Sequence, residues 1–188
     1  MRIISGNLRG KKILQPKDKF TRPLKDLTKE SIFNILEHSN LIKVNIYNSN
    51  ILDLFSGVGS FGLECLSRGS ISVTFIENYS NTLKLLKKNI SNTNFIEKSK
   101  IIEKNILEFK NLENIREKFD IIFIDPPYKE KKLPELVEKI IDLNLLKKRG
   151  IFIIHRHKKN DEKYPKKFNL LLEKNYGISK IIFGNQNL

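Results

Sequence analysis

The stretch Asp120-Ile-Ile-Phe-Ile-Asp-Pro-Pro-Tyr128 is the feature that most constrains how this 188-residue chain can fold. Its apolar residues run on without alternation, as in a strand of a parallel sheet that helices cover on both faces. The strand must stop abruptly, because Pro126 and Pro127 fix φ and lack an amide hydrogen. The sequence therefore predicts a stiff shelf after a buried strand at 121–125, at the sheet edge where open α/β folds bind ligands.

The shelf has the chemistry to hold a planar exocyclic amine. Asp125 and the backbone carbonyl of Pro126 are acceptors for its two N–H bonds, and the ring of Tyr128 can stack on the attached base. This assigns catalytic roles to Asp125, Pro126 and Tyr128. The alternative, that Asp-Pro-Pro is only a strand-ending turn, explains the motif equally well when the motif is taken alone.

Alternating strand and helix patterns begin at residue 51 and predict a doubly wound α/β fold. The expected strands are 51–55, 71–76, 100–103, 121–125 and 151–155. The expected helices are 61–68, 80–89, a short one within 107–118, and 133–146, with Gly69 and Gly150 marking helix ends. Residues 169–173 and 178–183 are expected to form a closing hairpin around Tyr176-Gly177.

The first 48 residues have a different character and form a small extension in front of a domain at 49–188. A hairpin is expected over 1–15 and an extended linker over 16–23. A helix over 24–38 then places Leu24, Leu27 and Ile32 on an apolar face and Lys25 and Lys29 away from it. The extension is too small to hold its own core, so we expect it to dock near the ligand edge and to close over a ligand bound there.

The net charge of +14 is concentrated outside the central segment. Residues 1–48 carry +6, residues 49–128 carry zero and residues 129–188 carry +8. The favoured interpretation is that both basic segments bind a polyanion. The alternative is that they form only a lysine-rich, solvated surface. The phosphate contacts are assigned to the basic side chains of the front piece: Arg2, Arg9, Lys11, Lys12 and Arg22.

Three loops at the same edge of the expected sheet can bind a nucleoside. Glycines 57, 59 and 62 follow the first strand in a dinucleotide-type spacing, which provides a tight turn, close ligand approach and close helix–strand packing. Glu77 ends the second strand, where its carboxylate can take both ribose hydroxyls, and Asn105-Ile106 follows the third, where it can clamp an adenine. The expected cofactor site is completed by Asp53, Phe55 and Asn78.

Asp53 distinguishes between two cofactor classes. A carboxylate beside the glycine turn would repel the pyrophosphate of NAD, but it would attract a cationic amino-acid moiety. S-adenosyl-L-methionine carries an adenine, a ribose, an ammonium and a sulfonium, and it has no phosphate. The three loops therefore predict S-adenosyl-L-methionine, and an NAD oxidoreductase is a weaker alternative.

The stretch Leu52-Asp-Leu-Phe-Ser-Gly-Val-Gly-Ser-Phe-Gly-Leu-Glu-Cys-Leu-Ser-Arg-Gly69 resembles the cofactor loop of the bacterial 16S ribosomal RNA guanine-N2 methyltransferases of the RsmD type. Asp125-Pro-Pro-Tyr128, the opening Arg2-Ile-Ile-Ser-Gly and the segment around Arg22-Pro23 are similar to that family as well. The resemblance implies a Rossmann-like class I methyltransferase fold with a seven-stranded, mostly parallel sheet. It also implies as target a guanine of the 966 type in 16S rRNA, within an assembling 30S subunit.

This chain departs from the family pattern at three positions. Leu27 stands where a family arginine is expected, Lys29 where arginine is usual, and His155 where a carboxylate is expected after the fifth strand. These departures bear on how RNA is contacted and leave the expected chemistry intact.

Other features set limits on the class of protein. A single cysteine excludes an internal disulfide, and Cys65 is interpreted as an inert core thiol. No metal is expected, because His155 and His157 share a strand face without a third ligand. Lys147-Lys148-Arg149 is expected to be a solvated helix end. Without an apolar run long enough to cross a bilayer, a monomeric cytoplasmic enzyme is expected.

These features together predict S-adenosylmethionine-dependent methylation of a guanine N2 in small-subunit rRNA, by in-line transfer to a flipped base. One alternative is a DNA adenine-N6 methyltransferase, which shares the Asp-Pro-Pro-Tyr motif but needs a target-recognition domain. Another is a non-catalytic RNA-binding assembly factor, against which the intact Asp53, Glu77 and Asp125 argue.

Overall fold

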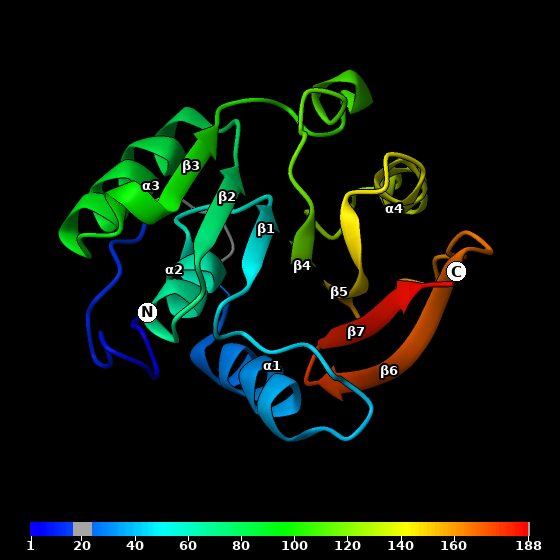
Figure 1. The fold of residues 1–188 in the computed structure, drawn as a ribbon, viewed down its shortest axis with the longest axis horizontal. Coiled ribbons are helices and arrows are strands. Elements are labelled where there is room, and N and C mark those ends of the chain that lie inside the picture. Colours follow the sequence, from blue (N-terminus) through cyan, green and yellow to red (C-terminus); the bar gives the residue numbers. More distant parts are fainter. Residues whose placement is uncertain (17–23, 188) are drawn as a thin grey trace.

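The strands form one sheet in a computed structural model that describes residues 1–16 and 24–187 (Figure 1). Within this part of the chain the sheet has seven strands in the order β3-β2-β1-β4-β5-β7-β6. Strands β1 to β5 pair in parallel, and β7 pairs antiparallel with both β5 and β6. The strands are β1 Asn50–Leu54, β2 Ser72–Ile76, β3 Ser99–Ile102, β4 Phe119–Ile124, β5 Leu146–His157, β6 Phe168–Tyr176 and β7 Ser179–Gln186. The expected mostly parallel sheet is confirmed.

Helices cover both faces of the sheet, and each face has its own apolar core. The helices are α1 Asp26–His38, α2 Ser60–Ser67, α3 Ser80–Asn92 and α4 Leu133–Asp142, with short 3-10 turns η1 Ile96–Lys98 and η2 Phe109–Asn111. Ile121 and Phe123 of β4 face the core formed with α1, α2 and α3, whereas Ile122 and Ile124 face the core formed with α4. The continuous apolar run of β4 thus serves two cores at once.

The carboxyl ends of the parallel strands meet in one row. Leu54 of β1 pairs with Ile76 of β2 and with Ile124 of β4, and Ile76 pairs with Ile102 of β3. The residues that come directly after this row therefore emerge at one edge. β1 and β4 are neighbours although the chain leaves them toward opposite sides of the sheet, which makes this edge a topological switch point.

The first residues dock on α2 and α3 through buried side chains. Glu64 accepts hydrogen bonds from the amides of Ile4 at 2.7 Å and Ser5 at 2.9 Å, and Asn89 accepts one from Leu14 at 2.8 Å. The expected hairpin is reduced to a single antiparallel bridge between Arg2 and Lys12. The extension is therefore attached through the main domain's polar side chains more than through its own strand pairing.

Two expectations about the later helices are wrong. The helix expected within 107–118 is only the three-residue turn η2, and Leu112 and Ile115 are the buried residues of this mostly exposed segment. The last helix ends at Asp142, and Lys147-Lys148-Arg149 and Gly150 lie inside β5. The strand is favoured there because Lys147 Nζ contacts Asp120 Oδ2 on β4 at 2.7 Å. At Gly150, a Cβ would approach the Asp120 carbonyl to 2.9 Å, so only glycine fits this close pairing.

The expected faces of α1 are wrong at two positions. Leu27 is 78% exposed, whereas Lys29 is completely buried. Lys29 Nζ donates to the Arg2 carbonyl at 2.6 Å and lies 3.4 Å from Glu64 Oε2. Burial lowers the pKa of Lys29, and the neighbouring Glu64 carboxylate opposes that effect. The ammonium thus joins the front extension to α2, and its apolar stem belongs to the core.

Candidate active site

The loop after β1 is shaped by one buried carboxylate. Asp53 is 1% exposed, and its Oδ2 accepts a hydrogen bond from the Gly62 amide in the first turn of α2 at 3.0 Å. Phe55 adopts a left-handed conformation (φ 57°), which is rare for a bulky residue and marks a site under local strain. This turn directs Phe55 into the cavity described below.

The carboxylate of Glu77 closes the glycine loop from the side of β2. Its Oε2 accepts a hydrogen bond from the Gly57 amide at 2.7 Å, and its Oε1 accepts from the amides of Asn78 and Tyr79, each at 2.8 Å. A carboxylate offers about four acceptor positions, so one remains for a ligand hydroxyl in this conformation. The expectation that Glu77 takes both ribose hydroxyls thus requires one of these amide bonds to be exchanged on binding.

Of the three glycines in this loop, Gly57 lies next to the ligand site, whereas Gly59 was expected to do so. Gly57 has φ 54° and open space beside it, so it makes the turn next to the ligand. Gly59 has φ 84°, and a Cβ there would lie 2.6 Å from Leu86, so it faces the core. At Gly62 a Cβ would lie 2.3 Å from the ring of Phe75, as expected for close helix–strand packing.

The shelf after β4 is held by side chains from β5 and β7. Asp125 Oδ1 lies 2.9 Å from Nδ1 of His155, which is 3% exposed. The hydroxyl of Tyr128 shares a hydrogen bond of 2.6 Å with Ser179 Oγ. The Tyr128 ring meets His155 and His157 edge-on, with ring centroids 6.0 Å and 5.0 Å apart. Both the carboxylate and the aromatic ring therefore have fixed orientations.

A buried arginine, which sequence reasoning missed, holds the rest of the shelf. The Arg156 guanidinium is 0% exposed and donates to the carbonyls of Pro127 at 2.9 Å and Glu130 at 2.8 Å. Its Nε donates to Glu162 Oε1 at 2.7 Å, so the charge is paired inside the protein. The sequence gives no signal for this contact, because Arg156 stands in a polar run that looks exposed.

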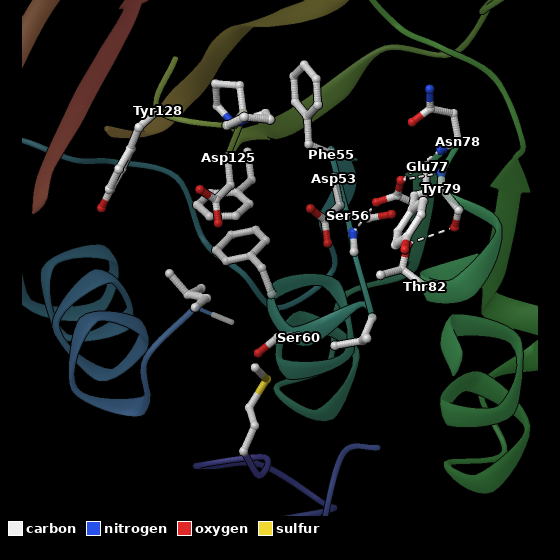
Figure 2. Close-up of a pocket in the computed structure, with 18 of the residues that line it drawn as sticks. Asp53, Phe55, Ser56, Ser60, Glu77, Asn78, Tyr79, Thr82, Asp125 and Tyr128 are labelled. Carbon is white, nitrogen blue, oxygen red and sulfur yellow. Dashed lines mark hydrogen bonds between the residues drawn. The ribbon is translucent and has the colours of Figure 1, made fainter. Parts of the chain in front are cut away.

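One cavity of about 630 Å³ joins these loops. Figure 2 shows Tyr128, Asp125, Asp53 and Glu77 following one another along its edge, with Ser60 of α2 on the opposite wall. Of the residues assigned to the cofactor and catalysis, those brought together here are Asp53, Phe55, Gly57, Glu77, Asn78, Asp125, Pro126 and Tyr128. Met1 and Leu24 of the extension also line the cavity.

Four expected cofactor residues do not line the cavity: Gly59 and Gly62, which face the core, and Asn105 and Ile106, which lie in the loop after β3. The side chain of Asn105 accepts a hydrogen bond from the Leu107 amide at 3.1 Å, so it shapes its own turn. Ile106 is 3% exposed and belongs to the core beneath α4. Neither residue is among those lining the cavity.

The electrostatics of the cavity favour a cationic ligand. The amides of Gly57 and Gly62, which would bind a pyrophosphate in a dinucleotide fold, already donate to Glu77 and Asp53. Burial raises the pKa of Asp53 well above its ordinary value, the hydrogen bond from Gly62 opposes this, and the negative charges of Asp125 and Glu77 add to it. A sulfonium and an ammonium offset this crowding of carboxylates, so the site fits S-adenosyl-L-methionine and disfavours NAD.

The residues assigned to phosphate contacts surround the Arg2–Lys12 bridge. Arg2, Arg9, Lys11 and Lys12 are all exposed, and Arg2 and Lys12 face each other across the bridge. Arg22 lies outside the described residues. The front extension therefore presents a basic surface beside the cavity that Met1 lines.

The rings of His155 and His157 both meet the Tyr128 ring edge-on. Across residues 1–16 and 24–187, no three His, Cys, Asp or Glu side chains gather in a way that would hold a metal ion. In the same part of the chain, every helix is too short or too polar to cross a bilayer.

The fold and the site define a class I, S-adenosyl-L-methionine-dependent methyltransferase, and the cavity lies at the switch point between β1 and β4. The family profile described as "Conserved hypothetical protein 95" matches residues 1–185. The chain belongs to this family, the RsmD family of methyltransferases, as its motifs indicate.

Known relatives match this chain over most of their length. It is 32% identical to the ribosomal RNA small subunit methyltransferase D of Haemophilus influenzae, over 95% of this chain and 90% of that protein. It is 36% identical to the protein of the same name from Buchnera aphidicola of Acyrthosiphon pisum, covering 92% and 86%. A crystal structure of a proposed methylase from Haemophilus influenzae matches with TM-score 0.77 and 31% identity, covering 100% and 98%. A proposed methyltransferase from Escherichia coli matches with TM-score 0.82 and 26% identity, covering 99% and 97%.

Proposed function

We propose that this protein methylates the exocyclic N2 of a guanine in small-subunit ribosomal RNA, acting as a monomer on an assembling 30S particle. The observation that carries the proposal is that Asp125 and Tyr128 line the same cavity as Asp53 and Glu77. An acceptor for an amine and an aromatic surface for a base thus lie beside a site suited to S-adenosylmethionine. The relatives named as small-subunit rRNA methyltransferases support rRNA as the substrate class.

The shelf positions the amine. S-adenosylmethionine supplies, when bound, a methyl group on a good leaving group, so the protein's main task is orientation. His155 orients the carboxylate of Asp125, which accepts an N–H of the amine. The Pro126 carbonyl accepts the second N–H, which leaves the nitrogen lone pair directed toward the cofactor side of the cavity.

Charge then develops on the amine, and Asp125 stabilises it. Because the amine becomes strongly acidic as the new N–C bond forms, no strong base is needed beforehand. Asp125 or a water molecule receives the proton afterwards. The target base must leave its stack to reach the shelf, where Tyr128 stacks on it. The bonds from Ser179 and the edge contacts of His157 keep the Tyr128 ring in place for that role.

The front extension grips the RNA and closes over the cofactor. Met1 and Leu24 already line the cavity, and Arg2, Arg9, Lys11 and Lys12 are exposed on the same small unit. Phosphate contacts from these side chains make RNA affinity fall steeply as salt rises.

A radiolabelled methyl-transfer assay on three substrates tests the proposal. Stripped 30S particles, free 16S rRNA and duplex DNA are each incubated with the enzyme, and the labelled nucleoside is identified by mass spectrometry. We expect N2-methylguanosine in the rRNA and no transfer to DNA. N6-methyladenine in DNA would instead identify an amino-methyltransferase acting on DNA, and no transfer to any substrate would support an assembly factor without activity.

A further inference from the structure

A second hollow, of about 680 Å³, lies between α1 and β6. We call it the α1–β6 groove. The helix contributes one face of α1, and β6 contributes alternate residues; the lining is Ser31, Asn34, Ile35, His38, Ser39, Leu41, Leu172, Lys174 and Tyr176. Figure 1 shows α1 beside the β6–β7 hairpin, at the edge of the sheet away from β3. Its volume is in the range of small-ligand sites.

The groove continues the sheet face that holds Tyr128. Ser179 of β7 pairs with His157 of β5 on one side and with Tyr176 of β6 on the other. Residues directly opposite in antiparallel pairs project to the same face, so these three side chains form a row across the sheet. The groove's Tyr176 is therefore two strand spacings, about 10 Å, from the His157 that contacts the ring of Tyr128.

The next row of side chains on the same sheet face, two residues along each strand, contains a positive charge. Ile181 pairs with His155 and with Lys174, so Lys174 shares a face with the histidine that contacts Asp125. Lys174 is exposed and lines the groove. A cation and an aromatic ring thus lie together on the same side of the molecule as the catalytic shelf.

The polar groups of the groove are suited to a nucleotide, which carries a negatively charged phosphate and an aromatic base. The groove's nine lining residues include no carboxylate. Of the acids near the groove, Glu37 pairs with Arg68, and Glu173 of β6 alternates to the other face, where it lies 3.7 Å from Lys180. Glu30 is exposed on α1 one turn before Asn34 and is not part of the lining. Lys174 can contact a phosphate, Tyr176 can stack on a base, and Asn34 can bond to a base edge.

We infer that the α1–β6 groove binds a nucleotide of the substrate RNA that flanks the methylated base. This inference rests on the proposed function, because the flanking nucleotide is defined by the base on the shelf. RNA is favoured over another protein by the absence of acidic lining, by the continuity with the Tyr128 face and by the chain's net charge of +14. Contacts to a flanking nucleotide position the target base on the shelf without contacting that base.

Variants in the groove and matched variants elsewhere test the inference. Tyr176→Ala and Lys174→Gln are compared with Tyr47→Ala, which changes a 62% exposed tyrosine, and Lys98→Gln, which changes an exposed lysine beside β3 at the opposite sheet edge. Affinity for a 16S rRNA fragment is measured by filter binding over a salt series, and S-adenosylmethionine affinity is measured separately. Wild-type rRNA containing 4-thiouridine is also cross-linked to the protein by ultraviolet light.

We expect Tyr176→Ala to weaken RNA binding about tenfold and Lys174→Gln to reduce the salt slope by about one, with both controls unchanged. S-adenosylmethionine affinity should stay within twofold, and cross-linked peptides should include Tyr176. RNA affinity and salt slope equal to wild type in both groove variants would overturn the inference. So would a groove variant that only converts a dimer to a monomer in sedimentation, because the groove would then be an interface between copies. A wild-type enzyme that binds RNA through the groove but transfers no methyl group would refute the proposed function alone.

Discussion

Nδ1 of His155 lies 2.9 Å from Oδ1 of Asp125, across the boundary between β5 and β4. A carboxylate only accepts, so the ring nitrogen donates to Asp125 and fixes the rotation of its side chain. His155 is almost fully buried, and Tyr128 covers its ring edge-on. The histidine is therefore a positioning residue for the carboxylate that orients the amine.

Removing this contact should slow methyl transfer without weakening cofactor binding. In His155→Ala, Asp125 gains rotational freedom, and we expect kcat to fall about 10- to 100-fold. His155→Asn places an amide N–H close to the position of Nδ1 and should recover most of the rate. Single-turnover kinetics with 30S particles measure both variants. Equal rates in wild type and His155→Ala would refute the positioning role.

Asp53 should make cofactor binding depend on pH. Its raised pKa means that the free protein keeps a proton there to a higher pH than an ordinary aspartate would, and a bound cation favours loss of that proton. Affinity should therefore rise with pH, and binding should release a proton. Calorimetry in two buffers of different ionisation enthalpy measures the release. In Asp53→Asn the release should disappear; an undiminished release would assign the proton to another group.

The same carboxylate should lower the stability of the free protein as pH rises. A carboxyl whose pKa is raised in the folded state holds more protons there than in the unfolded state, so the free energy of unfolding falls as pH increases above the ordinary pKa of aspartate. Asp53→Asn should remove this slope and leave the free protein more stable than wild type at neutral pH. Denaturant unfolding at several pH values checks this, and a variant less stable than wild type at every pH would contradict it.

Arg156 should be needed to hold the shelf as well as to stabilise the fold. Arg156→Lys keeps a positive charge beside Glu162, but it lacks the guanidinium N–H groups that donate to the carbonyls of Pro127 and Glu130. We expect the free energy of unfolding to drop by about 2 kcal/mol and kcat to fall about tenfold, with cofactor affinity unchanged. The control Lys167→Ala breaks an exposed, solvent-screened ion pair with Asp142 and should leave the free energy of unfolding close to that of wild type. A folded Arg156→Lys enzyme with normal kcat would show that the arginine is structural only.

The parts of the molecule that follow from local pattern could be predicted from the sequence. The five parallel strands, the closing hairpin, α2, α3 and the start of α4 follow from apolar periodicity. Asp53, Glu77 and Asp125 were expected to meet because parallel strands end at one edge, and all three line the cavity. Where spacing and topology decide the geometry, sequence alone is sufficient.

The remainder depends on contacts between distant segments. Lys29 is buried because Arg2 and Glu64 meet its ammonium, and nothing near Lys29 in sequence indicates those partners. Arg156 is buried for a similar reason, through carbonyls of a loop that precedes it by almost thirty residues. The expected adenine clamp at Asn105 follows strand order correctly, but its side chain bonds within its own turn. Polar residues like these reveal their roles only when the fold is known.

The glycine loop provides a matched pair of substitutions. In Gly62→Ala the new Cβ would lie 2.3 Å from the Phe75 ring, so helix α2 must move away from the sheet. In Gly57→Ala the methyl group meets open space, and only the strain of φ 54° remains, about 1 kcal/mol. Thermal unfolding should show the larger loss for Gly62→Ala. A larger loss for Gly57→Ala would contradict the assigned roles.

The most direct test of the account separates cofactor binding from methyl transfer in Asp125→Ala. S-adenosylmethionine affinity is measured by calorimetry, and single-turnover transfer to stripped 30S particles is measured with labelled cofactor. The account predicts affinity within about threefold of wild type and a rate reduced at least about 100-fold, because the amine loses its principal acceptor. Methyl transfer at a near-normal rate in Asp125→Ala would contradict it.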